Sequence, residues 1–175
     1  RNVMRYVKPH HRIVAMDNIG FGKSEQPRDL DYTFQAHYGY IEAFIDAMEL
    51  KDVILVIHDW GSVLGLNYAM ENSDNVKGVA MMEALIPPTF PMEDAGFFAN
   101  FRNPESGREL LINQNMFIEN ILLTGSRTRS MTEAEKDVYR EPFTDVESRF
   151  PIYVWPNELP IAGEPARNVE VIENI

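Results

Sequence analysis

A short apolar run at residues 53–57 stops abruptly at His58 and Asp59 and is followed by Trp60 and Gly61. A buried strand that ends on a reactive side chain and enters a helix through glycine is typical of a nucleophile elbow. This is the sharp turn that exposes one side chain above a parallel sheet. Here that side chain is the carboxylate of Asp59, so one turn constrains both the fold and the chemistry of the chain.

The type of side chain at this turn narrows the chemistry further. Aspartate has an ordinary pKa of about 3.9 and is already an anion at neutral pH, whereas a serine hydroxyl needs a base to become reactive. A carboxylate can displace a leaving group from saturated carbon, which gives an alkyl ester that water then cleaves. The indole N–H of Trp60 is a donor only, which suits it to hold a departing anion. The alternative is that Asp59 only caps the next helix.

Small residues recur at four-residue spacing after the turn, at Gly61, Gly65 and Ala69. Residues four apart lie on the same face of a helix, so they form a small-residue stripe. We expect this stripe to let the helix backbone lie close against the sheet, as a tight elbow requires.

Composition sets limits on size and partners. The 175 residues can form one core but fall short of the roughly 250 to 300 that a covered sheet with a lid needs, and the chain begins at Arg1, so we expect a fragment. A net charge of −11 argues against nucleic acid and anionic membranes as partners, and no apolar run is long enough to span a bilayer. The absence of cysteine excludes disulfides and thiolate metal sites. The sequence does not determine the cellular compartment. We expect the bacterial cytoplasm, with the periplasm as the alternative.

The first half of the chain alternates strands and helices. Apolar runs predict strands at 12–17, 53–58 and 78–83, and helical spacing predicts helices at 33–48 and 62–71. Nearly continuous apolar strands joined by helices predict an α/β fold with a parallel sheet and right-handed crossovers.

Acidic residues end all three predicted strands. In parallel sheets, function gathers at the carboxyl ends of the strands, where Asp17, Asp59 and Glu83 stand. Asp17 is the least informative of them, because an acid at a strand end usually anchors the following loop. That loop, residues 18–24, contains two glycines but lacks the third glycine of a dinucleotide-binding fingerprint, which argues against that function.

The character of the sequence changes at residues 86–91, where a proline-rich run ends both strand and helix. The following residues are helical in pattern: Leu110, Phe117 and Ile121 share a face, Leu111 and Ile118 lie beside it, and Thr132 with Glu135 fits a capping box. We therefore predict a core at 1–86, a helical cap at 87–160 and the beginning of the return to the core at 161–175.

At this point the sequence resembles the haloalkane dehalogenases of the α/β-hydrolase superfamily, along its whole length. The segments that carry the resemblance are IHDWGS at 57–62, GFGKS at 20–24, ME at 82–83, QNMFIE at 114–119, YREPF at 139–143 and PNELPIAGEP at 156–165. The resemblance implies an α/β-hydrolase fold, a parallel-sheet core with an inserted helical cap, and hydrolysis of carbon–halogen bonds without a metal or organic cofactor.

The resemblance also implies roles for individual residues. Asp59 matches the nucleophile, Trp60 the halide-binding indole, and Glu83 the acid that orients the catalytic histidine. The substrate pocket is expected to be lined by six residues of the lid: Phe98, Phe101, Phe117, Ile121, Pro156 and Leu159. The alternative for Glu83 is a strand-end acid paired with a surface cation, and the alternative for the aromatic lid residues is ordinary core packing.

Two parts of the family pattern have no counterpart in the sequence. The second halide donor, an asparagine, would precede Arg1, and the histidine base would follow Ile175. The sequence contains four histidines. His58 precedes the nucleophile, so strand alternation predicts that its side chain points away from the site. His10, His11 and His37 are expected to be structural or solvated.

Several functions remain open from the sequence. A dehalogenase would act on a small halogenated alkane and water and release halide, and its oligomeric state is unknown. Epoxide hydrolases share the Asp-Trp pair, but their lids supply tyrosines, and the lid here offers only Tyr139 and Tyr153. A coelenterazine-type luciferase on the same scaffold would also carry such an elbow, and so would an inactive, truncated member of the family.

Overall fold

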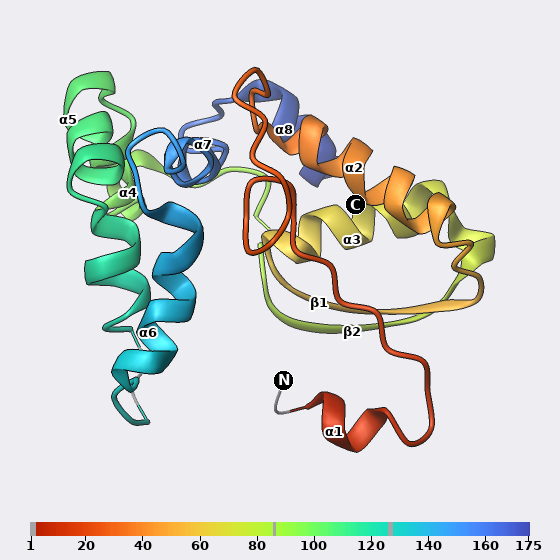
Figure 1. Ribbon diagram of the computed structural model, residues 1–175. Helices are drawn as coiled ribbons and strands as arrows, with labels where there is room; N and C mark the ends of the chain where they lie inside the picture. Colours follow the sequence, from red (N-terminus) through yellow and green to blue (C-terminus); the bar gives the residue numbers. More distant parts are fainter. Residues whose placement is uncertain (1–2, 86, 126–127) are drawn as a thin grey trace.

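The structure of the chain is a computed structural model that describes residues 3–85, 87–125 and 128–175. Figure 1 shows its helices and strands along the chain. The α-helices are α1 Met4–Val7, α2 Phe34–Ala47, α3 Trp60–Glu71, α4 Phe98–Phe101, α5 Pro104–Arg108, α6 Glu133–Arg140, α7 Phe150–Asn157 and α8 Ala166–Asn174. The strands are β1 Val53–Asp59 and β2 Val76–Ala84. Shorter turns are the 3₁₀ segments Ser73–Asn75, Met92–Asp94 and Glu141–Phe143 and the π-helical segments η3 Glu109–Asn113 and η4 Phe117–Leu122.

The two strands lie parallel and form one sheet, as the sequence predicts. The register joins Ile57 to Met81 and His58 to Met82, and it becomes irregular between His58 and Asp59. The strand predicted at 12–17 is wrong, because this segment is irregular. A strand needs a neighbour with which its backbone groups form a ladder. Within the described residues, 12–17 join neither β1 nor β2.

Within the described residues, the helices cover one face of the sheet, and β2 is largely exposed on both faces. Figure 1 shows α2 and α3 on the same side of β1 and β2. Side chains that alternate with the covered ones are exposed, for example Ile54 at 59% and Val56 at 67%. The expectation that the strand at 53–58 is buried is therefore wrong for one of its faces, because an apolar sequence does not ensure that another element packs on that face.

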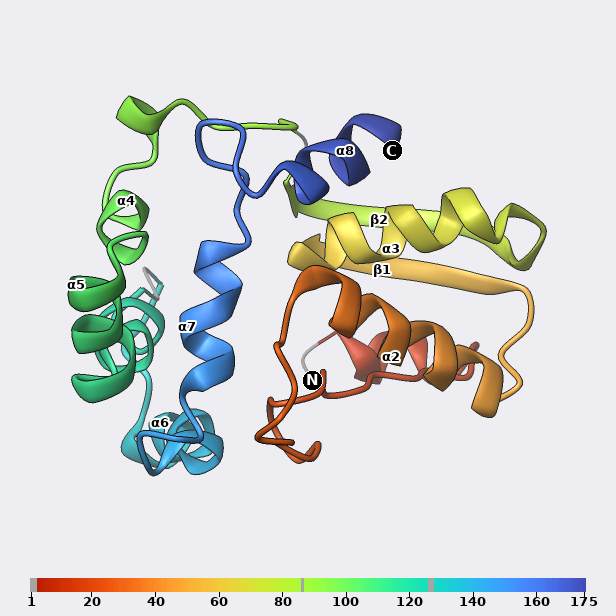
Figure 2. The ribbon, with the colours of Figure 1, turned by 90° about the horizontal axis from the view of Figure 1, so that it is seen from above.

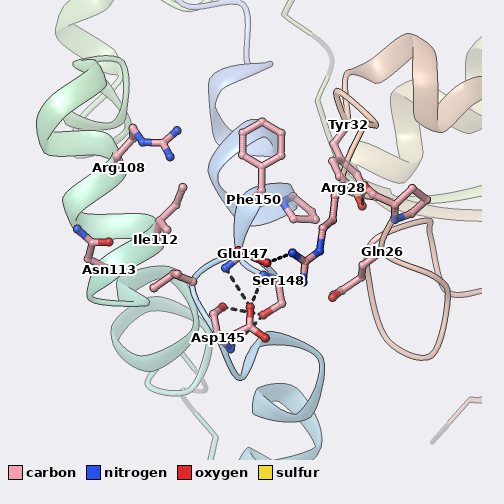
Figure 3. Close-up of a pocket in the computed structure, with 13 residues that line it drawn as sticks. Gln26, Arg28, Tyr32, Arg108, Ile112, Asn113, Asp145, Glu147, Ser148 and Phe150 are labelled. Carbon is pink, nitrogen blue, oxygen red and sulfur yellow. Dashed lines mark hydrogen bonds and ion pairs between the residues drawn. The ribbon is translucent and has the colours of Figure 1, made fainter.

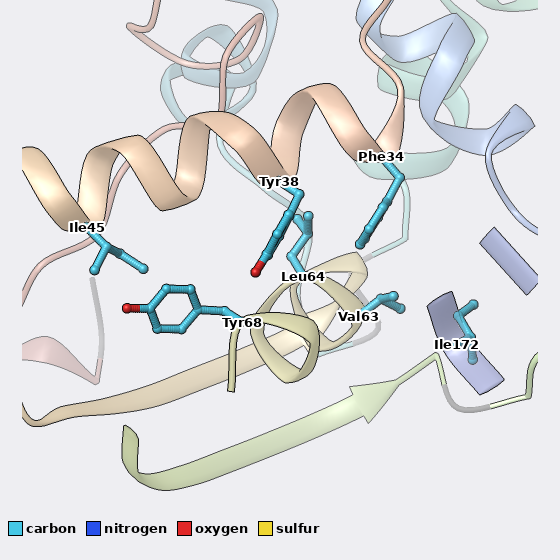
Figure 4. Packing of buried hydrophobic residues seen from close by; sticks show 7 residues of the cluster. All are labelled: Phe34, Tyr38, Ile45, Val63, Leu64, Tyr68 and Ile172. Carbon is cyan, nitrogen blue, oxygen red and sulfur yellow. The ribbon is translucent and has the colours of Figure 1, made fainter. Parts of the chain in front are cut away.

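The core lies between α2, α3 and α8. Phe34 and Tyr38 of α2 pack against Val63 and Leu64 of α3, and Ile172 of α8 closes the cluster (Figure 4). The predicted helix at 33–48 is confirmed, with the Thr33 hydroxyl accepting a hydrogen bond from the backbone of Ala36 at its first turn. Its last predicted apolar residue, Met48, follows the helix and is exposed.

Of the small-residue stripe, Gly65 makes the close approach. A Cβ at Gly65 would stand 2.6 Å from the Ile57 Cγ2 atom, so only glycine lets α3 lie this close to β1. At Gly61 a Cβ would meet no atom within 4 Å among the described residues. The predicted contact of the helix with the sheet is therefore confirmed at the second glycine and not at the first.

Between β2 and residue 160, the regular elements of the described residues are helices. The capping box at Thr132 and Glu135 is confirmed at the start of α6. Two π-helical segments break the expected spacing, since backbone bonds there join residues five apart, as from Gln114 to Glu109. Leu111 and Ile118 are buried, whereas Leu110 and Phe117 on the neighbouring face are only half-buried.

The two ends of this helical segment meet. The backbone N–H of Phe90 donates to the Pro160 carbonyl at 3.0 Å, and the Thr89 hydroxyl donates to the same carbonyl at 2.7 Å. The backbone N–H of Gly163 donates to the Thr89 hydroxyl at 2.8 Å. Figure 2 shows α4 to α7 set to one side of the sheet, with the chain returning to it at α8. Ile86, the first residue of the proline-rich run, lies outside the described residues.

The helices of the described residues are short or polar. None of them combines the length and the apolar character needed to cross a bilayer.

Candidate active site

The turn at Asp59 has the geometry that the sequence predicts. β1 ends at Asp59 and α3 begins at the next residue, Trp60. Asp59 has φ 52° and ψ −129°, a conformation that is costly for a residue with a side chain, of the order of 1–3 kcal/mol. The Asp59 side chain is exposed. Such strain persists only where the neighbouring structure enforces it. The turn places the Asp59 carboxylate at the carboxyl end of the sheet.

Trp60 lies in a column of aromatic rings. Its indole stacks on Trp155 of α7, with ring centroids 4.8 Å apart and planes 24° apart, and it meets the Phe34 ring at 6.2 Å. Trp155 in turn stacks on His37 of α2 at 4.3 Å. The sequence pattern gives no role to Trp155, although it directly precedes the segment 156–165 that carries the resemblance. The column fixes the plane of the Trp60 indole beside Asp59.

Glu83 lies near the end of the neighbouring strand, β2. Its φ is 45°, which interrupts the alternation of side chains along the strand. Its carboxylate contacts the His58 imidazole, with Nε2 and Oε2 3.0 Å apart, and both side chains are largely exposed. This contact places His58 beside one of the two candidate carboxylates, which alternation alone does not predict. The pairing also fits the alternative function of Glu83, a strand-end acid with a surface partner.

Asp17 anchors the loop that follows it. Its Oδ2 accepts a hydrogen bond from the Lys23 backbone at 3.0 Å, and its carbonyl accepts one from the Ser24 hydroxyl at 2.6 Å. Gly22 has φ +56°, and a Cβ there would meet the Asp17 carboxylate at 2.3 Å. The structural interpretation of Asp17 is therefore confirmed.

The six residues expected to line the substrate pocket lie on three elements. Phe98 and Phe101 belong to α4 and meet edge to face at 5.8 Å, and Phe101 is only 1% exposed. Phe117 and Ile121 lie in η4, and Pro156 and Leu159 lie in or just after α7. Among the described residues, no hydrogen bond or ring contact joins any of the six to Asp59. Full burial of Phe101 in the helical segment fits core packing.

A cavity of about 540 Å³ lies elsewhere, between the loop at 26–32 and the helical segment. Figure 3 shows Tyr32 and Phe150 on its wall, with Arg108 across the cavity and the ion pair of Arg28 with Glu147 at its rim. It contains none of the predicted site residues. A volume of this size does not by itself identify the site, and the reactive side chains lie at the ends of β1 and β2.

The other histidines differ in their surroundings. His37 is 1% exposed, so it is structural and not solvated, and burial lowers its pKa to about 4 despite the opposing charge of Asp31. It is therefore neutral at pH 7. His10 and His11 are exposed. The helix that carries His37 has one face in the core. The sequence pattern does not reveal that His37 lies on that buried face.

Comparison with known proteins shows the family to which the chain belongs. Residues 1–119 match the model of the alpha/beta hydrolase fold family, and the chain belongs to that family. Within it, the chain is similar to haloalkane dehalogenases, as its motifs indicate. It is 41% identical over 180 aligned residues to one from Sphingobium indicum B90A and 40% identical over 173 to one from Mesorhizobium japonicum.

Solved structures give the same result. Haloalkane dehalogenase DbeA from Bradyrhizobium elkani matches with a TM-score of 0.92 and 37% identity, over 99% of this chain and 61% of that chain. The alignments cover 98% of this chain but 60% of the Sphingobium relative, and 95% and 55% for the Mesorhizobium relative. The chain therefore spans somewhat more than half of the length of these relatives.

Proposed function

We propose that the whole protein is a haloalkane dehalogenase that converts a small halogenated alkane and water into an alcohol and halide. The observation that carries the proposal is an aspartate at the strained turn between β1 and α3, followed directly by a half-buried tryptophan. A serine there would indicate acyl transfer, whereas a carboxylate indicates displacement at saturated carbon. Relatives that carry the name haloalkane dehalogenase at 36–41% identity support it.

In the first step, an Asp59 carboxylate oxygen attacks the carbon that bears the halogen. The C–O bond forms as the carbon–halogen bond breaks, and the halide leaves with the bonding pair. Trp60 holds the departing halide through its indole N–H. Stacking on Trp155 keeps the indole in one orientation, so little reorganisation is needed when negative charge develops.

In the second step, a base takes a proton from water as the water oxygen attacks the carboxyl carbon of the ester. The bond between that carbon and the alkyl oxygen then breaks, the alcohol leaves with one proton, and the Asp59 carboxylate is restored with release of the other proton. The resemblance implies that this base is a histidine, and the family's histidine base has no counterpart among the 175 residues. Glu83 would orient that histidine and stabilise its charged form. The backbone N–H after Asp59 would help to hold the oxyanion.

The division of the chain fits this function. We propose a core at 1–86, a cap at 87–160 and a return to the core from 161, with Thr89 and Pro160 joined at the base of the cap. Phe117, Ile121, Pro156 and Leu159 are the cap residues proposed to shape the substrate pocket, together with Phe98 and Phe101. A cap that excludes water strengthens the interaction of the indole with the anion.

Two other functions on this scaffold have less support. An epoxide hydrolase needs lid tyrosines that reach the epoxide oxygen, and here the Tyr153 ring packs on Phe150 and under the Arg108 guanidinium. Tyr139 is exposed on α6. No residue of the chain specifically favours a coelenterazine luciferase.

The test is halide release from 1,2-dibromoethane by the whole protein, with the Asp59→Asn variant as the matched control. We expect release by the unmodified protein and none above background by the variant. Diol formation from styrene oxide without halide release would support an epoxide hydrolase instead, and light emission with coelenterazine would support a luciferase. Retained halide release in Asp59→Asn would overturn the assignment of the nucleophile.

A further inference from the structure

Ser62 makes two hydrogen bonds that join the ends of the two strands. It lies in the first turn of α3 and is 0% exposed. Its hydroxyl donates to the carbonyl oxygen of Asp59 and accepts from the backbone N–H of Leu85 at 3.0 Å. One buried hydroxyl therefore links the residue at the elbow to the chain just after β2.

A bond from serine to a preceding carbonyl is common in helices and would not by itself indicate a special role. The second bond is different, because Leu85 follows another strand, 23 residues further along the chain. It reaches the segment that carries Glu83 two residues earlier. Capping of its own helix does not require Ser62 to bond the backbone after another strand.

The location of these bonds matters because the ladder between the strands is irregular there. The register between β1 and β2 becomes irregular between His58 and Asp59. Asp59 and Glu83 both have positive φ, at 52° and 45°. The backbone at both carboxylates is thus strained, and such strain needs local bonds to hold it in place. Ser62 supplies a further cross-link beside the irregular last pair of the ladder, Asp59 with Ala84.

We propose that Ser62 is a positioning residue that fixes the backbone of Asp59 relative to that of Glu83. The proposal rests on the proposed dehalogenase function for its catalytic consequence, whereas the cross-link itself does not. The hydroxyl donates its one proton to Asp59 and accepts one hydrogen bond from Leu85, so both interactions are made within the protein. It holds the elbow and does not touch the substrate.

The first test is amide exchange at Leu85 in Ser62→Ala, measured by NMR on the whole protein. Val63→Ala is the matched control, because Val63 is the next residue of α3, is 1% exposed and takes no part in the cross-link. We expect exchange at Leu85 to become faster by about tenfold in Ser62→Ala, the size of one lost buried hydrogen bond, and to change less in Val63→Ala at matched stability. Unchanged exchange at Leu85 would overturn the proposal.

The second test separates positioning from stability. Single-turnover formation of the alkyl ester from 1,2-dibromoethane should slow by about tenfold or more in Ser62→Ala, with KM little changed, because a displaced nucleophile misses the near-attack geometry. Val63→Ala should keep its rate. Equal losses in the two variants would mean a structural role only, and that outcome overturns the proposal.

The two proposals can fail separately. If the unmodified protein releases no halide, the dehalogenase function fails, and amide exchange at Leu85 still decides whether Ser62 links the strands. Should Ser62→Ala not fold, Ser62→Cys keeps the shape of the side chain with a somewhat larger atom and replaces the hydroxyl with a weak donor, and the same two measurements apply.

Discussion

The carboxylate of Glu158 accepts a hydrogen bond from the backbone N–H of Phe34, 124 residues earlier in the chain, at 2.9 Å. Glu158 is 4% exposed and also binds the Asn168 amide at 3.0 Å and the Arg167 guanidinium. The first N–H groups of a helix have no partner within it, and the helix dipole favours an anion at that end. One acid after α7 therefore holds the start of α2 and the start of α8.

Replacement of Glu158 should destabilise the protein strongly. Glu158→Ala leaves the Phe34 N–H and the Asn168 amide buried without this partner, and we expect a loss of about 3 kcal/mol or more in the free energy of unfolding. Glu158→Gln keeps an acceptor oxygen and should lose less. Urea denaturation measures both. The exposed Glu170→Ala in α8 is the control, and an equal effect in the two alanine variants would show that the buried contacts carry no special weight.

The two glycines of α3 should respond oppositely to alanine. At Gly65 a methyl would collide with Ile57, and we expect Gly65→Ala to cost about 1–3 kcal/mol. At Gly61 the space is open among the described residues, and alanine has the higher helix propensity, so Gly61→Ala should leave stability unchanged or raise it by up to about 1 kcal/mol. Thermal unfolding of the pair tests this. A stable Gly65→Ala variant would contradict the close contact of α3 with β1.

Protonation of His37 should make the fold sensitive to acid. Burial lowers its pKa to about 4 in the folded state, below about 6.5 in the unfolded chain. The unfolded chain therefore gains the proton first as the pH falls. The contribution of His37 to stability is complete above pH 6.5 and is lost between 6.5 and 4, by up to about 3 kcal/mol.

The matched variant for this prediction is His37→Phe, which keeps a ring against Trp155 and removes two buried nitrogens that have no hydrogen-bond partner among the described residues. Its free energy of unfolding should fall less between pH 7 and pH 4.5 than that of the unmodified protein. His10→Gln, at an exposed position, should retain the full dependence. An unchanged pH dependence in His37→Phe would refute the assignment.

The two stacked tryptophans should differ in their effect on catalysis. Trp60→Phe keeps a ring in the column but removes the N–H that is proposed to hold the halide, and we expect turnover to fall by about a hundredfold. Trp155→Phe keeps the stack and removes an N–H with no proposed role, so turnover should change much less. Halide release under saturating substrate measures both. Equal effects would show that stacking, and not donation, is what Trp60 contributes.

The sequence predicts local features well where one principle dominates. The helix at 33–48, the turn at Asp59 and the capping box at Thr132 all follow from patterns of a few neighbouring residues. The burial of His37 and the links made by Glu158 and Ser62 do not, because they depend on contacts between distant segments. The π-helical turns are missed because the expected spacing assumes 3.6 residues per turn.

The strand expected at 12–17 fails for a related reason. Apolar residues give a segment the capacity to pair, but pairing also needs a neighbour at the right distance, and that is a property of the whole sheet. For the candidate site, the sequence identifies Asp59, Trp60 and Glu83 by type and position. It does not reveal that Glu83 contacts His58 or that Trp155 stacks on Trp60.

A methionine on the exposed face of the sheet can report, through its oxidation, whether that face is covered. Met82 is 54% exposed, so peroxide can reach its thioether and convert it to a sulfoxide. Packing of other residues against this face would slow that oxidation. The rate of sulfoxide formation at Met82 therefore measures how completely the sheet is sheltered in any form of the protein, independently of whether it turns over a substrate.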